Sequence, residues 1–321
     1  MGEPVRHALR RTDARAHPCA GACSHPDAGR GGHTAAGDDA RAAPEQAAPV
    51  PPRLRPGRRT PTPARPTIAG VRVAELWRYP VKSLQGERLD AVRVTADGLE
   101  GDRRYAIFDL ETGFGLTARR RPELLFASAR LGEDGGVEIT LPGGAVAADD
   151  TALSAWLGRP VTLRRAAAGG DAPRRFENVE DPEDDAASAW SAFVGAGGTA
   201  FHDEPEARVS LVSRATIAQW DPRRFRSNVL LDGEGEEALV GSRATLGEAV
   251  LDVGMRIQRC VMVTRPQPGG IERDLTVLRT VARERDACLA VGALVAEPGV
   301  VRVGDALTPD ASQPYRAPRP V

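Results

Sequence analysis

Apolar and polar residues alternate in short runs between residues 69 and 310, and glycine-rich turns separate these runs. An alternation with a period of two is typical of β-strands that bury one face. Two of the runs, 126–131 and 137–141, flank Glu133-Asp134-Gly135-Gly136 and predict a β-hairpin. The predicted strands are 71–79, 92–94, 105–110, 126–131, 137–141, 209–212, 225–231, 249–253, 257–264, 290–296 and 300–303.

Helical periodicity is confined to a few short segments. Leu153, Trp156 and Leu157 predict a short helix that Asp150 or Thr151 caps. Further helices are predicted around residues 217–220 and over residues 275–282. Many short strands with few helices predict a mixed α/β chain that is predominantly β, arranged as a barrel or a sandwich.

The first 68 residues differ in composition from the rest. They hold 11 of the 26 prolines and four of the five histidines, and they contain no Phe, Trp or Tyr. Such a segment buries too little apolar surface to offset the entropy lost on ordering, so it is predicted to be disordered. His17, Cys19, Cys23 and His25 are metal-ligand residue types within this segment, but their spacing fits no zinc module.

These patterns predict four segments: a disordered tail at 1–68, domains at 69–200 and 201–310, and a C-terminal tail at 311–321. Residues 177–185 are acidic and do not follow the spacing of an EF-hand loop. We therefore predict a solvated linker there rather than a calcium site.

The overall charge is close to balanced, with 43 basic and 44 acidic residues and a net charge of −1. This balance argues against a nucleic-acid or membrane partner, and the sequence has neither a long apolar run nor a signal-peptide pattern. The cysteines Cys19, Cys23, Cys260 and Cys288 do not form a disulfide framework. A cytoplasmic, reducing location is expected.

Lysine is almost absent from the chain. Lys82 is the single lysine, and the other 42 basic residues are arginines. Since an ammonium and a guanidinium bind anions differently, Lys82 is a candidate functional residue. The alternative, a solvated surface lysine without a function, remains open.

Groups that bind oxyanions gather in three short motifs. Residues 79–83 place Lys82 and Ser83 after a strand, and residues 101–105 include Arg103. Arg226 and Asn228 are predicted to lie two apart on one strand and thus on the same face. Arginine forks, a lysine point charge and amide donors together are typical of phosphate recognition.

Cys260 lies in the segment Arg-Ile-Gln-Arg-Cys-Val-Met-Val-Thr, with Arg256 and Arg259 before it and a predicted strand after it. Neighbouring cations favour the thiolate, which is a soft metal ligand or a nucleophile. A buried cysteine without chemistry is the competing interpretation, and it predicts that Cys260→Ser changes only the stability.

Several motifs, in their order along the chain, resemble the MOSC family, the molybdenum cofactor sulfurase C-terminal-like proteins with an N-terminal β-barrel domain. The nearest subgroup is the amidoxime-reducing component type. The resemblance covers roughly residues 69–309. The motifs are Tyr-Pro-Val-Lys-Ser at 79–83, Gly-Asp-Arg-Arg at 101–104, Thr-Ala-Arg at 117–119, Phe-Arg-x-Asn at 225–228, Arg-Cys at 259–260 and Val-Arg-Val-Gly-Asp at 301–305.

The resemblance implies a MOSC N-terminal β-barrel-like domain and a MOSC β-barrel core with short helices. It also implies a molybdenum pyranopterin cofactor with the Cys260 thiolate as the metal ligand and catalytic residue. The cofactor-binding residues that it implies are Lys82, Ser83, Arg103, Arg119, Ser213, Thr216, Arg226, Asn228 and Arg259. Tyr105 and His202 are candidate proton donors whose place relative to the metal the sequence does not give.

The implied activity is an oxidoreductase that reduces N-hydroxylated small molecules such as amidoximes and hydroxylamines. The chain carries no ferredoxin-type cysteine cluster after the core, so a separate ferredoxin- or flavin-type electron donor is expected. The alternative is a carrier of the cofactor or of sulfur, with a persulfide on Cys260 and no redox turnover. The chain departs from its relatives at Ile257, where many have a second cysteine, and at Ser227, where proline is usual.

Overall fold

The computed structural model describes residues 70–167, 174–179 and 189–314. These residues belong to one compact unit, Pro61–Val321. The predicted disordered tail, with its His17–His25 cluster, lies outside the described residues, and so do residues 180–185 of the predicted acidic linker. The division into domains at residue 200 stays a prediction.

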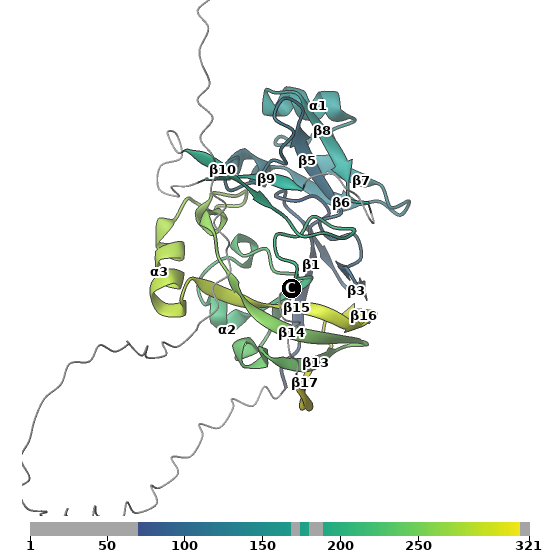
Figure 1. Cartoon of the computed structure of the whole chain (residues 1–321), viewed down its shortest axis with the longest axis vertical. Helices are drawn as coiled ribbons and strands as arrows, with labels where there is room; N and C mark the ends of the chain where they lie inside the picture. Colours follow the sequence, from purple (N-terminus) through teal and green to yellow (C-terminus); the bar gives the residue numbers. More distant parts are fainter. Residues whose placement is uncertain (1–69, 168–173, 180–188, 315–321) are drawn as a thin grey trace, which may run out of the picture. The chain divides into compact units, whose positions relative to one another are not determined.

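A large mixed sheet organises the described chain (Figure 1). Its neighbouring strands are antiparallel except for β11 and β12, which are parallel. β1 and β2 come from the first half of the sequence, yet they pair beside β12. In spatial order the strands are β17 (Leu307–Pro314), β13 (Ser242–Leu246), β14 (Ala249–Gln258), β15 (Cys288–Glu297), β11 (Val209–Ser213), β12 (Val229–Leu231), β1 (Val73–Arg78) and β2 (Glu87–Leu89).

Four smaller sheets are built mainly from the first half of the chain. The predicted hairpin is confirmed, because β6 pairs with β7 in an antiparallel register. One of these sheets joins segments that are far apart in the sequence, since β16 pairs with β3. The sheets are β5 (Tyr105–Asp109) with β8 (Val161–Arg165), β9 (Arg175–Val179) with β10 (Trp190–Val194), β6 (Ser128–Leu131) with β7 (Val137–Thr140), and β3 (Ala91–Thr95) between β4 (Gly98–Leu99) and β16 (Gly299–Arg302).

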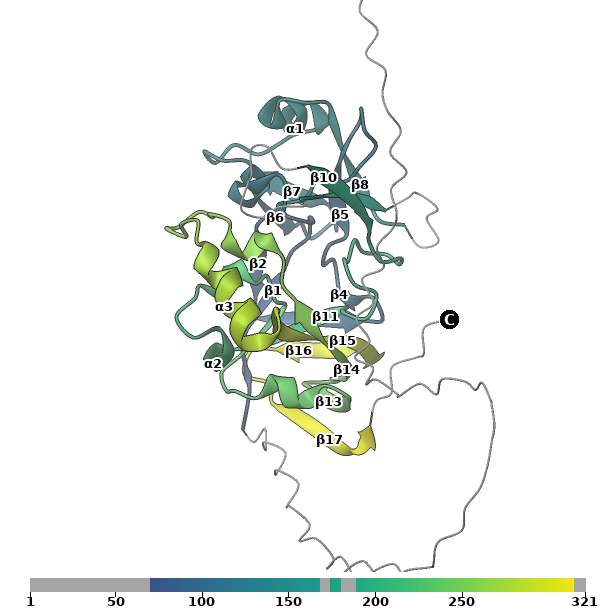
Figure 2. The same cartoon turned by 60° about the vertical axis from the view of Figure 1, so that its left-hand side comes forward.

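Helices are few and short, which confirms the predominantly β prediction. Asp149 caps α1 by accepting a hydrogen bond from the Ala152 backbone N–H, one residue before the predicted cap. Figure 2 shows α3 on the outside of the large sheet, where it packs against η4 and β15. The helices are α1 (Asp150–Leu157), α2 (Arg214–Ile217) and α3 (Leu275–Arg285), and the 3-10 turns are η1 (Pro122–Phe126), η2 (Pro222–Arg224), η3 (Glu236–Leu239) and η4 (Val261–Thr264).

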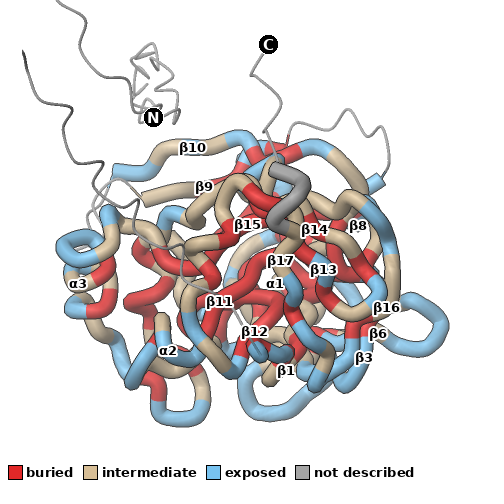
Figure 3. The backbone as a smooth tube through the Cα atoms, turned by 90° about the horizontal axis from the view of Figure 1, so that it is seen from below, coloured by how far each residue is buried: buried red, intermediate tan, exposed pale blue. Residues whose placement is uncertain are grey.

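The apolar core follows the strands of the large sheet, where β11 and β12 are buried throughout and β15 is buried over half of its length (Figure 3). A second core lies under α1 and the sheets of the first half. A third lies between the large sheet and α3, and it includes Val277, Val281 and Leu289. Burial at about 25 cal/mol per Å² of apolar surface makes these cores the main source of stability.

The predicted strand at 257–264 is wrong in its second half. β14 ends at Gln258, and residues 261–264 form the 3-10 turn η4. The Thr264 Oγ1 donates to the Val261 carbonyl over 2.7 Å, which closes the turn. Val261 and Val263 are buried and Met262 between them is half-buried, an alternation that a strand would also show, so the burial pattern does not distinguish the two structures. The turn places Cys260 immediately before η4.

Glu177 contradicts the prediction of a solvated linker. It lies in β9 with a fully buried side chain. The Arg120 Nη1 lies 2.7 Å from its Oε1 and the Arg121 Nε lies 3.4 Å from its Oε2. These two guanidinium groups supply the counter-charge that lets a carboxylate leave water.

We expect Glu177→Ala to lower the free energy of unfolding by about 3 kcal/mol, because it leaves two partly buried guanidinium groups without their counter-ion. Denaturant unfolding of the full chain measures this change. The matched control is Glu138→Ala, which breaks an exposed pair with Arg130 and is expected to cost less than about 1 kcal/mol. Equal losses in the two variants would contradict the structural role of Glu177.

Candidate functional site

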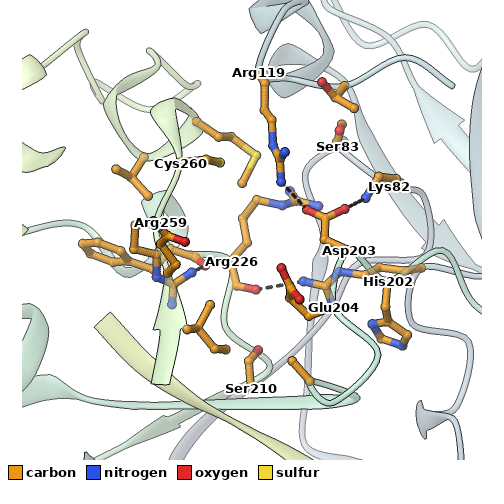
Figure 4. Close-up of a pocket in the computed structure, with 18 of the residues that line it drawn as sticks. Lys82, Ser83, Arg119, His202, Asp203, Glu204, Ser210, Arg226, Arg259 and Cys260 are labelled. Carbon is orange, nitrogen blue, oxygen red and sulfur yellow. Dashed lines mark hydrogen bonds and ion pairs between the residues drawn. The ribbon is translucent and has the colours of Figure 1, made fainter. Parts of the chain in front are cut away.

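A cavity of about 140 Å³ lies where β11, the loop before β12 and the end of β14 meet loops of the first half of the chain (Figure 4). Its wall combines cationic, amide and thiol groups with an apolar side. The lining residues are Lys82, Ser83, Arg103, Thr117, Arg119, His202, Asp203, Glu204, Ala207, Ser210, Phe225, Arg226, Asn228, Ile257, Gln258, Arg259, Cys260, Met262 and Val263.

Eight of the site residues expected from the sequence share this cavity. They come from segments as far apart as residues 82 and 260, so the fold brings together motifs that are distant in the sequence. They are Lys82, Ser83, Arg103, Arg119, Arg226, Asn228, Arg259 and Cys260.

Ser213 and Thr216 are not among the lining residues. Ser213 is the N-cap of α2, and its Oγ accepts a hydrogen bond from the Thr216 backbone N–H over 3.3 Å. The same hydroxyl donates to the buried Glu236 Oε2 over 2.6 Å. The structure thus gives both residues a local role at the start of α2.

Arg226 and Asn228 do not lie on a strand, contrary to the prediction, because β12 begins only at Val229. The turn η2 starts at Pro222, and Arg226 then adopts a left-handed conformation with φ 50°. Asn228 is fixed instead by side-chain bonds, since its Oδ1 accepts from the Ser210 Oγ over 2.9 Å and its Nδ2 donates to the Trp77 carbonyl over 3.3 Å. The two residues reach the same cavity from a turn.

Three residues of the cavity wall have a strained backbone. Ser83, Arg103 and Arg226 all have positive φ angles, of 72°, 50° and 50°. The left-handed region is uncommon for residues with a Cβ, and it costs of order 1–3 kcal/mol each where the surroundings impose it. The Ser83 hydroxyl accepts a hydrogen bond from the Ala118 backbone N–H over 3.0 Å, which holds the loop that carries Arg119.

Two of the wall cations, Arg226 and Arg259, are held by backbone carbonyls, whereas Arg103 pairs with the buried Asp102. Arg226 donates to the Leu84 carbonyl, and its guanidinium lies 4.2 Å from the centroid of the Tyr79 ring. Arg259 donates through Nε to Leu289 over 2.6 Å and through Nη1 to Phe225 over 2.9 Å. Its Nη2 is buried and has no hydrogen-bond partner within the described chain. A donor is therefore left for a ligand that carries an acceptor.

The electrostatics of the cavity favour an anion. Five cationic side chains face two carboxylates, Asp203 and Glu204. Burial lowers the pKa of Arg226 and of Arg259 to about 10. Burial also lowers the pKa of Lys82, although Asp203 opposes that shift. An anion that enters would relieve these buried charges of like sign.

Asp203 is one of the polar lining residues that the sequence interpretation missed, together with Thr117, Glu204, Ser210 and Gln258. Its Oδ2 lies 2.7 Å from the Arg119 Nη2, and its Oδ1 accepts a hydrogen bond from the Lys82 Nζ. Nothing in the local sequence distinguishes it from the acidic residues around it, because its role depends on cations that are far away in the chain. Of the two candidate proton donors, His202 lines the cavity and Tyr105 does not.

Cys260 is a free, half-buried thiol at the start of η4. The Arg119 side chain, on the same cavity wall, reaches Asp203 (Figure 4). Although burial alone would lower the pKa of Arg119, the Cys260 and Asp203 groups raise it above its ordinary value. Phe225, Ile257 and Met262 form an apolar side of the same cavity. Among the described residues, no three His, Cys, Asp or Glu side chains converge as a metal site.

Two domain families match the chain. Residues 70–192 match the MOSC N-terminal beta barrel domain, and residues 198–308 match the MOSC domain. The chain belongs to the MOSC family. Cys260 and Arg226 fall within the MOSC domain match, and Lys82 and Arg119 fall within the N-terminal match.

A curated relative is the bovine (Bos taurus) protein named mitochondrial amidoxime reducing component 2, which is 38% identical over 85 residues. That match spans 26% of this chain and 24% of the relative's length. Among solved structures, the YUAD protein from Bacillus subtilis has a TM-score of 0.35 at 12% identity, with 77% of this chain and 97% of that chain covered. YiiM from Geobacillus stearothermophilus has a TM-score of 0.27 at 16% identity, with 32% and 54% covered. Among the described residues, no helix has the length and apolar character needed to cross a membrane.

His202 provides a pH-dependent prediction. It is 2% exposed, and burial lowers its pKa to about 4, so it is neutral in the folded protein. The unfolded chain binds the proton near pH 6.5, and stability is therefore lost as the pH falls from 6.5 toward 4. We expect this residue to account for about 2 kcal/mol of lost stability between pH 7 and pH 5.

Denaturant unfolding of the full chain gives the free energy of unfolding at pH 7 and at pH 5. The loss between the two pH values is compared between the wild type and His202→Gln. The variant should show a smaller loss on acidification, since it removes this group and leaves the carboxylates in place. An identical loss in both proteins would refute the assignment of a neutral, buried His202.

Proposed function

We propose that this protein binds a molybdenum pyranopterin in the cavity, with the Cys260 thiolate as the protein ligand to the metal. The observation that carries the proposal is that Cys260 shares one cavity with five cationic side chains. A thiolate suits a soft, high-valent metal, and clustered cations suit a phosphate.

The side chains of the cavity fit both the phosphate and the flat ring part of such a cofactor. Lys82, Arg103 and Arg226 would hold the phosphate, with Asn228 as an amide donor on the same wall. The unpartnered Arg259 Nη2 supplies a hydrogen bond that only an added acceptor completes. The apolar side at Phe225 and Met262 would contact the flat part of the cofactor and keep water from it.

The bound cofactor would supply two-electron chemistry for the reduction of an N-hydroxylated compound, such as an amidoxime or a hydroxylamine, to the amidine or amine and water. The protein would orient the cofactor and balance its charge, and a separate ferredoxin- or flavin-type protein would deliver the electrons. The bovine relative whose name includes amidoxime reduction supports this substrate class.

The first test is the molybdenum and pterin content of the full chain, purified from a host that makes the cofactor. We expect both in the wild type. Cys260→Ser should lose the metal and the reduction of benzamidoxime by an artificial electron donor, because it removes the thiolate. Cys288→Ser is the matched control, since Cys288 is also a free, half-buried thiol but does not line the cavity.

If Cys260 carried an extra sulfur atom and the protein held pterin without turnover, the persulfide-carrier hypothesis would replace this proposal. The absence of both molybdenum and pterin from wild-type protein made in a competent host would overturn the cofactor assignment itself.

A second test concerns the cations. Arg226→Met should weaken pterin retention at least about tenfold, because a buried charge that faces the ligand is removed. Arg223→Met is the control, since Arg223 pairs with Asp221 and is not among the lining residues. Equal pterin loss during dialysis of the two variants would contradict the role of Arg226.

A further inference from the structure

Two cations of the cavity wall, Lys82 and Arg119, lie over aromatic rings. The guanidinium carbon of Arg119 is 4.3 Å from the centroid of the Phe193 ring. The Lys82 Nζ is 5.7 Å from the same centroid and 4.7 Å from the centroid of the Phe176 ring. Phe193 is therefore a ring that both cations share.

The ring of Phe193 is held in place by its neighbours. Phe193 belongs to β10 and pairs with Phe176 of β9, and the centroids of the two rings are 5.7 Å apart. It is half-buried and packs against an aromatic cluster that also contains Phe108 and Phe201. Phe193 is not among the residues that line the cavity, so it acts on a ligand through the two cations.

The two cations have like charges, yet both reach the carboxylate of Asp203 (Figure 4). Burial and the Arg119 charge lower the pKa of Lys82, whereas Asp203 raises it. The negative face of an aromatic ring attracts a cation, and more strongly where water is excluded. Unlike a second carboxylate, a ring carries no net charge that would repel an entering anion.

We propose that Phe193 is a positioning residue that keeps Lys82 and Arg119 charged and in place for an anionic ligand of the cavity. Leucine at this position would fill much of the volume but would offer no negative face. Tyrosine would keep the ring, and its hydroxyl can reach water from a half-buried site. The inference rests on the anion-binding half of the proposed function and is independent of the metal and of redox turnover.

The charge of Lys82 can be followed directly, because it is the single lysine of the chain. Lysine that is isotope-labelled at Cε gives one NMR resonance in the full chain, made without a lysine-containing tag, and the pH titration of this resonance reports the pKa of Lys82. We expect Phe193→Leu to titrate at a lower pH than the wild type, because the ammonium loses a ring that favours it. Phe193→Tyr should titrate like the wild type.

Titration calorimetry with phenyl phosphate at pH 7.5 measures anion binding by the same proteins, made in a host that lacks the pterin pathway. We expect Phe193→Leu to bind the probe about fivefold more weakly than the wild type, and Phe193→Tyr to restore the affinity. Phe193→Met, which also lacks a ring, should match the leucine variant. Thermal unfolding of each variant checks the fold.

The matched control is Trp190→Leu on the same strand. The Trp190 ring lies 4.5 Å from the guanidinium carbon of Arg120. Arg120 pairs with Glu177 and does not line the cavity. Removing this ring should change neither the titration of Lys82 nor the binding of phenyl phosphate.

A wild-type titration and a wild-type affinity in folded Phe193→Leu and Phe193→Met would overturn the inference. Equal losses in Phe193→Leu and Trp190→Leu would assign the effect to the whole of β10 and would also overturn it, as would a folded Phe193→Tyr that binds no better than Phe193→Leu. Absence of phenyl phosphate binding in every protein, with the shift of the Lys82 titration still present, would overturn the anion-binding half of the proposed function and confirm the contact between Phe193 and Lys82.

Discussion

The buried positive charge of the cavity is the constraint on which the rest of the site depends. Guanidinium and ammonium groups lose hydration when they leave water, and the fold has to replace it. Arg226 and Arg259 meet this need with backbone carbonyls, while Lys82 and Arg119 share the carboxylate of Asp203. Carbonyls offer dipoles without cancelling the charge, so the wall stays electropositive and keeps its affinity for an anion.

Much of the architecture could be predicted from alternation and turns. The hairpin of β6 and β7 and the helix α3 follow from local patterns that the structure confirms. Residues 261–264 have the composition and the alternating burial of a strand, but they form the 3-10 turn η4, which the Thr264 hydroxyl closes. Glu177 lies in an acidic stretch of the sequence, yet its side chain is buried and pairs with arginines from another segment.

Some residues of the site could likewise be predicted from their local sequence, whereas others depend on contacts with distant segments. Lys82 and Cys260 are rare residue types next to turns or charges, which made them candidates from the sequence, and both line the cavity. Asp203 is one acid among many, and only the folded chain brings it to Lys82 and Arg119. Ser213 and Thr216 were indicated by a motif match, and the structure shows them capping α2 outside the lining of the cavity.

The pairing of β3 with β16 has a consequence for the order in which the protein folds. β3 is synthesised before its partner β16, with more than half of the chain between them. β1 is likewise synthesised well before its partner β12. Closing such long loops is slow, since the chain entropy is lost before the contacts form. The cavity wall draws on residues from Lys82 to Val263, so it cannot be complete until most of the chain has been synthesised.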